Sequence, residues 1–138
     1  MMEVLFTVIV FACCGYACWK GGRDGRLVSA LLILAGIMTV VVKALFDHTW
    51  AQTNIPVLVV DLSLLLALAW VAKSTRYYWP VWICGLHLAS IATHFGAGLL
   101  DGGIKPVVYY NMQSFWSIPE LVIMVLGIAT DRRYGLLK

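Results

Sequence analysis

The chain has 138 residues, of which 62% are hydrophobic and 12% are charged, and its formal net charge is +3. Soluble globular domains average about 25% charged residues, so this composition excludes an ordinary soluble domain and is typical of a membrane protein. The small positive charge fits basic residues beside membrane spans and gives no indication of nucleic-acid binding.

Hydrophobic runs occupy most of the chain. An α-helix needs about 20 mainly apolar residues to cross the hydrocarbon core of a bilayer, and each run approaches that length. The runs comprise residues 4–19, 27–46, 56–72, 80–100 and 107–130. They predict an all-α bundle of five transmembrane helices, which forms a single domain over residues 1–138.

The basic residues fall mainly into alternate gaps between these runs. They follow the first, third and fifth runs, as Lys20, Arg23, Arg26, Lys73, Arg76, Arg132, Arg133 and Lys138. Basic residues near membrane ends remain in the cytoplasm, so we predict that the N-terminus lies outside and the C-terminus lies in the cytoplasm. This charge order also indicates that the first run is a retained helix, because a signal peptide carries its positive charges before the apolar stretch.

Glycine and aromatic residues mark the expected connections. Gly21, Gly22 and Gly25 predict a break in the helix after the first run. An aromatic cluster at the cytoplasmic start of the fourth run predicts an anchoring belt at the membrane boundary. The cluster comprises Tyr77, Tyr78, Trp79 and Trp82.

Polar residues inside the runs are the candidate functional residues. They are Lys43, Asp61, His87, His94, Asn111, Gln113 and Glu120. At 1.5 Å per residue, Asp61 and His94 lie about 8 and 9 Å inside the outer end of their helices. By the same rise, His87 and Glu120 lie about 20 Å inside, near the middle of the membrane. A charge facing lipid is costly, so these groups should point inward and meet one another.

Two interpretations of this cluster remain open. The first is structural, in which Lys43 pairs with Asp61 and His87 pairs with Glu120 to fix the register of the helices. The second is functional, in which the residues line a polar cavity that opens outward and binds a small ligand or conducts protons. Ionisable residues within membranes serve such roles by default.

Cofactor chemistry offers fewer candidates. A b-type haem needs histidines on opposite faces of its iron, and His48 with His94 is the pair that fits. His87 and His94 lie seven residues apart on one helix, about 10 Å along its axis, so they cannot clamp one haem. The chain carries no metal-ligand spacing and no catalytic motif, so we expect neither a metal site nor a conventional enzyme.

Two stretches carry a resemblance to a known group. They are His94 through Gln113-Ser114-Phe115-Trp116-Ser117-Ile118-Pro119, and Asn54-Ile55-Pro56 with Asp61. Over most of its length the chain resembles small uncharacterised bacterial inner-membrane proteins. The resemblance implies a multi-pass protein of the bacterial inner membrane and brings no activity, cofactor or partner with it.

The sequence therefore favours a non-enzymatic membrane component that acts as an accessory or small-ligand-binding subunit. The alternatives are a haem or redox-cofactor anchor and a small transporter or proton-conducting component. Five short helices expose a large perimeter, so besides the lipid bilayer we expect a homo-oligomer or a larger membrane complex as partner.

Overall fold

The computed structural model describes residues 2–45, 55–99 and 106–136, and the side chains within these ranges except those of residues 2–5 and 96–114. The described chain is entirely helical, with no strand and five helices, which confirms the predicted fold class at this level. The helices are α1 (Met2–Lys20), α2 (Gly22–Leu45), α3 (Ile55–Ser74), α4 (Trp79–Leu99) and α5 (Pro106–Arg133). Most of them extend past the predicted runs, because polar residues at the ends of a run continue the helix.

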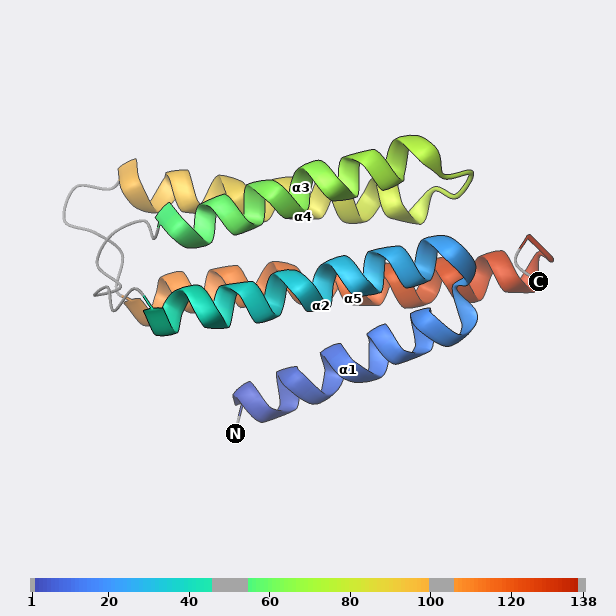
Figure 1. The fold of residues 1–138 in the computed structure, drawn as a ribbon, viewed down its shortest axis with the longest axis horizontal. Helices are drawn as coiled ribbons and strands as arrows, with labels where there is room; N and C mark the ends of the chain where they lie inside the picture. The colour runs from blue at the N-terminus through green and yellow to red at the C-terminus, as the bar shows by residue number, and fades with distance from the viewer. Residues whose placement is uncertain (1, 46–54, 100–105, 137–138) are drawn as a thin grey trace.

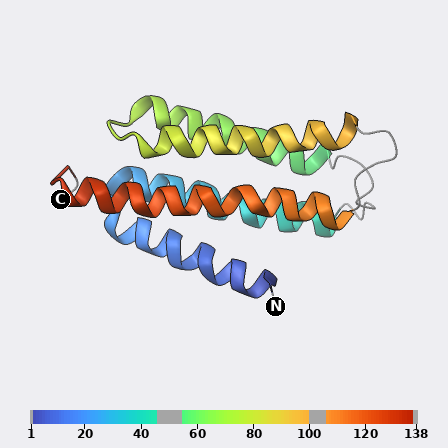
Figure 2. The same ribbon diagram turned by 180° about the vertical axis from the view of Figure 1, so that it is seen from behind.

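The helices run alternately up and down along one long axis (Figure 1). Each helix packs against its neighbour in the chain, and α5 also packs against α1, so the five helices form a ring. The α1–α2 and α3–α4 connections and the end of α5 lie at the same end of the bundle, as the reverse view also shows (Figure 2). This end, called the basic end below, carries seven of the basic residues that the sequence placed in the cytoplasm: Lys20, Arg23, Arg26, Lys73, Arg76, Arg132 and Arg133.

The sequence predicted a break in the helix from Gly21 to Gly25, but the break is shorter. Only Gly21 separates the two helices, because α2 begins at Gly22 and continues through Gly25. The chain turns at Gly22, whose φ of 63° is a left-handed conformation that glycine adopts without a steric penalty. A Cβ added at Gly25 would lie 2.6 Å from the carbonyl oxygen of Ala17. The glycines therefore serve mainly to bring the backbones of α1 and α2 into contact at the basic end.

Burial is uneven along α1 and α2. Cys14 and Ala17 of α1 and Val28 and Ser29 of α2 are buried, and all four lie in the halves nearest the basic end. Farther from that end, no described residue from Phe6 to Cys13 or from Ala30 to Leu45 is fully buried. Both ribbon views show α1 diverging from α2 toward its N-terminus (Figures 1 and 2). The two helices thus form a V that is closed at the basic end.

The aromatic cluster that the sequence assigned to a membrane belt is exposed only in part. Tyr78 and Trp82 are 83% and 67% exposed, as boundary anchors would be, whereas Trp79 is only 4% exposed. The side chain of Trp79 packs on Gly127 of α5, where the absence of a Cβ lets the two helices approach. Trp79 is therefore a packing residue of the core, and the belt prediction was wrong for it.

Large apolar side chains cover the outer surface of the bundle. Two helices, α2 and α3, are long and apolar enough to cross a membrane by length and composition. Exposed apolar residues also occur on the other helices, as Phe11 on α1, Phe95 on α4 and Leu126 on α5 show. Exposed apolar residues on every helix are suited to a membrane or a large interface.

The glycine–tryptophan contact gives a test of how α4 and α5 pack. Gly127→Ala would place a methyl group on the Trp79 side chain and force the helices apart, so we expect it to destabilise the fold by about 1–3 kcal/mol. Gly85→Ala is the matched control, because a Cβ at Gly85 meets no atom within 4 Å. Thermal unfolding of both purified variants measures the difference, and equal midpoints would contradict this packing.

Candidate functional site

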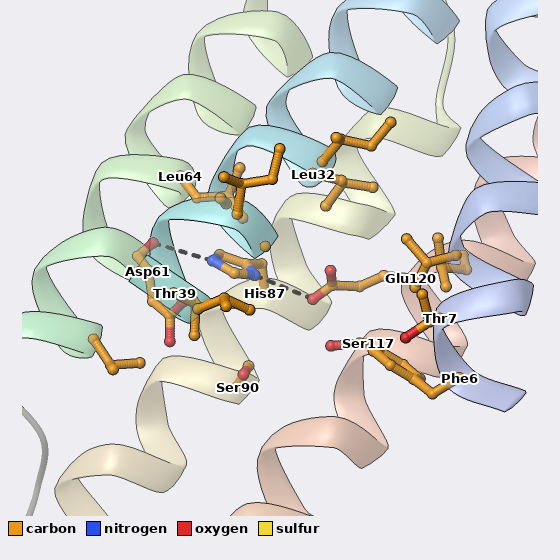
Figure 3. A pocket seen from close by; sticks show the side chains of 18 of the residues that line it. Phe6, Thr7, Leu32, Thr39, Asp61, Leu64, His87, Ser90, Ser117 and Glu120 are labelled. Carbon is orange, nitrogen blue, oxygen red and sulfur yellow. Dashed lines mark hydrogen bonds and ion pairs between the residues drawn. The ribbon is translucent and has the colours of Figure 1, made fainter. Parts of the chain in front are cut away.

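A cavity of about 750 Å³ lies within the ring of helices, and all five helices contribute to its lining. Figure 3 shows its polar side chains gathered around the imidazole ring of His87. The polar lining residues are Thr7 from α1, Thr39 and Lys43 from α2, Asp61 from α3, His87 and Ser90 from α4, and Ser117 and Glu120 from α5. Four of the candidate functional residues of the sequence therefore line this cavity: Lys43, Asp61, His87 and Glu120.

His87 lies at the centre of this group and is 5% exposed. Its Nδ1 lies 3.2 Å from Oε1 of Glu120, and its Nε2 lies 3.0 Å from the backbone carbonyl oxygen of Asp61 (Figure 3). The predicted pairing of His87 with Glu120 is thus confirmed. Both ring nitrogens are engaged, so the ring is held by two neighbouring helices at once.

The two contacts of His87 define where its protons can reside. A carbonyl oxygen only accepts hydrogen bonds, so Nε2 must carry a hydrogen and donate it to Asp61. Nδ1 and the Glu120 carboxyl then share one further proton. Either the protonated acid donates to Nδ1, or a protonated Nδ1 donates to the carboxylate. In either arrangement one proton lies between the two residues.

His94 forms a second acid–histidine pair two helical turns farther along α4. Its Nε2 lies 2.8 Å from Oδ2 of Asp61, and the His94 side chain is fully buried. The short distance is typical of a hydrogen bond that a charge assists. Asp61 therefore contacts His94 through its carboxylate and His87 through its backbone carbonyl.

Helical geometry explains why these residues meet. His87 and His94 are seven residues apart, so they lie on the same side of α4 and about 10 Å apart along it. Glu120 and Ser117 are three residues apart and likewise share one side of α5, which continues as a helix through Pro119. The two pairs connect α4 to α3 and to α5.

Lys43 lines the same cavity as Asp61 and takes part in an interaction of its own. Its predicted pairing with Asp61 stays a prediction, and the structure gives His94 as a partner of the Asp61 carboxylate. Asn111 and Gln113 belong to α5, but their side chains lie outside the described part of the structure.

Sequence reasoning missed two contributions to the site. The first is the backbone carbonyl of Asp61, which no residue pattern reveals because every residue carries one. The second is the wall formed by α1, where Phe6 and Thr7 line the cavity. The signal for the second was Thr7, a polar residue within an otherwise apolar stretch.

The haem alternative remains a prediction. His48 lies outside the described residues, and Nε2 of His94 is directed at Asp61. Among the residues that the structure describes, no group of three or more histidine, cysteine, aspartate or glutamate residues is arranged to hold a metal ion. The described cysteines, Cys13, Cys14, Cys18 and Cys84, are free thiols.

Comparison with protein-family models, with curated proteins and with solved structures gives no match to this chain.

The Asp61–His94 contact can be tested by a double-mutant cycle. Removing either partner alone leaves a buried polar group without its hydrogen bond, whereas removing both leaves none. We therefore expect Asp61→Ala and His94→Ala to be non-additive, with a coupling energy of about 1–1.7 kcal/mol in unfolding experiments, at the upper end of the range for polar contacts between membrane helices.

Thr93→Ala serves as the control partner in the same cycle, because the Thr93 hydroxyl bonds to the backbone of Ser90 within its own helix. It should combine additively with Asp61→Ala, to within about 0.5 kcal/mol. Additive behaviour in both cycles would show that Asp61 and His94 do not interact.

Proposed function

We propose that this protein is a five-span protein of the bacterial inner membrane that binds a small ligand in its cavity. In this proposal it acts as an accessory or ligand-binding subunit, with the N-terminus outside and the C-terminus in the cytoplasm. The observation that carries the proposal is the convergence of two acid–histidine pairs beside a cavity of about 750 Å³.

The distribution of polarity supports the membrane part of the proposal. Large apolar side chains face outward on every helix, while His87, His94 and Glu120 are buried inside. In a soluble bundle this arrangement would leave the apolar groups in water and the ionisable groups desolvated. The grouping of seven basic residues at one end supports a cytoplasmic position for that end.

The composition of the site supports ligand binding over a purely structural role. Hydrogen bonds between membrane helices average only about 0.6 kcal/mol, so stability gives a weak reason to keep so many ionisable groups together. A structural cluster would also be expected to fill its space. This one borders a cavity whose volume lies within the range of about 300–1,000 Å³ that ligand pockets occupy.

Reporter fusions test the topology. Fusions after Arg26, Lys73 and Lys138 should report the cytoplasm, and fusions after Thr53 and Gly103 should report the outside. The physical reason is the retention of basic residues on the cytoplasmic side. A cytoplasmic signal at Thr53 would contradict both the orientation and the five-span arrangement.

Glu120→Gln tests the ligand site. Glutamine keeps the shape of the acid and can still bond to His87, so the variant should insert and unfold at nearly the parent temperature. Its amide presents different hydrogen-bond donors to the cavity and cannot exchange a proton, so we expect it to lose small molecules that co-purify with the parent protein, as mass spectrometry of extracts would measure. His94→Gln should behave in the same way.

Ser63→Ala is a matched control for these variants, because Ser63 is exposed on α3 and bonds only within its helix. Marked unfolding of both site variants, with the ligand retained in the folded fraction, would show that the residues are structural.

A proton-conducting component is the second candidate function. It is favoured by the proton that His87 and Glu120 share, since chains of acids and histidines within membranes commonly relay protons. The same Glu120→Gln variant separates the two candidates. Loss of proton flux into liposomes with no change in bound small molecules would favour proton conduction.

A further inference from the structure

We propose that the cavity takes its ligand sideways from the bilayer, through the gap between α1 and α2. In this proposal the ligand is a membrane-soluble amphiphile with a neutral, oxygen-bearing head and a hydrocarbon tail, which is the chemistry of the prenylated quinones. The inference rests on the proposed membrane location and ligand-binding function, and it adds the route of entry and the ligand class.

The route follows from the exposure of residues that line the cavity. Phe11 on α1 and Ile37 and Val40 on α2 belong to the lining and are 63%, 53% and 67% exposed. Lining residues can be exposed to this extent only where the cavity is open to the surface. The opening therefore lies between α1 and α2, on the side of the bundle rather than at its basic end.

The packing of α1 and α2 independently supports an opening at this place. The helices touch through Ala17 and Gly25 near the basic end, and they diverge beyond it (Figures 1 and 2). Gly36 lines the cavity at this opening, and a Cβ added to it meets no atom within 4 Å. The rim of the opening is apolar, so it would face hydrocarbon in a bilayer.

The two sides of the cavity differ in chemistry. Helices α1 and α2 supply most of its apolar lining, including Phe6, Val10, Leu32 and Ile33. Helices α3, α4 and α5 supply both acids and the lining histidine, whereas the polar lining residues of α1 and α2 are Thr7, Thr39 and Lys43. If a ligand entered between α1 and α2, its leading end would reach the acids and the histidine of α3, α4 and α5. The rest of the ligand would then lie along the apolar side chains of α1 and α2. This arrangement suits an amphiphile that enters with its head first.

The charges of the site favour a neutral head. The acids Asp61 and Glu120 are each engaged by a histidine, and Lys43 adds one positive charge to the same lining. Because the lining holds charges of both signs, a charged head of either sign would lie beside a like charge as well as an opposite one. A carbonyl or hydroxyl head instead matches the hydroxyls of Ser90 and Ser117, which can donate and accept hydrogen bonds.

The test measures binding of a fully substituted benzoquinone that carries a decyl chain, with the protein in lipid nanodiscs and empty nanodiscs as the blank. Gly36→Phe should fill the opening and weaken binding at least tenfold. Gly85→Phe is the matched control, since Gly85 is also an exposed helical glycine with open space around its Cβ position but does not line the cavity. The control should bind like the parent.

Three further probes test the ligand class. The same ring with a methyl group in place of the chain should bind at least tenfold more weakly, because it lacks the tail. Decyl phosphate and decyltrimethylammonium, which carry charged heads, should also bind at least tenfold more weakly than the decyl quinone. Tighter binding of either charged probe would overturn the assignment of a neutral head, and equal binding by Gly36→Phe and Gly85→Phe would overturn the side entrance.

Failure of this inference is distinguishable from failure of the proposed function. If the decyl quinone does not bind, but the parent still co-purifies with a small molecule that Glu120→Gln lacks, the ligand class is wrong and the ligand-binding function stands. If the decyl quinone does not bind and parent and Glu120→Gln extracts are identical, both proposals are wrong.

Discussion

The contact of Asp61 with two histidines of one helix is the constraint on which the rest of the structure depends. An ionisable group away from water is costly unless it is paired, and here the pairing requires α3, α4 and α5 to keep a fixed register. Asp61 holds His94 through its carboxylate and His87 through its backbone carbonyl, while Glu120 holds the other side of His87. If α3 slid by one turn along α4, both histidine contacts of Asp61 would be lost together.

The remaining two helices obey a different constraint. α1 and α2 are joined by close backbone contact at Gly21 and Gly25. The ring thus combines a frame of three helices, fixed by directional polar contacts, with a V of two helices fixed at one end. The cavity lies where these two parts face each other, so both of its acids and its histidine come from the frame, and most of its apolar lining comes from the V.

Much of this arrangement could be predicted from the sequence, because apolar runs define helices and helical spacing places polar residues on one side. The equal depths of Asp61 and His94, and of His87 and Glu120, already matched the pairs that the structure contains. The sequence favoured Lys43 for Asp61 because opposite formal charge was the stronger signal, and depth alone did not decide the partner. The helical continuation through Gly25 and the burial of Trp79 depend on contacts with other helices, which local patterns do not contain.

The single-residue connection between α1 and α2 has a mechanical consequence. From Gly21 to Phe6, α1 acts as a lever arm of about 22 Å, from 1.5 Å of rise per residue. A change of about 10° in the angle between the two helices would move the far end of that arm by about 4 Å, roughly the width of a hydrocarbon chain. The angle is set where Gly21 and Gly25 touch Ala17 and Ile128, at the opposite end of the molecule from Phe6. The volume of the side chains at Gly21 and Gly25 therefore sets the width of the gap between α1 and α2 near Phe6, although these positions lie far from that gap.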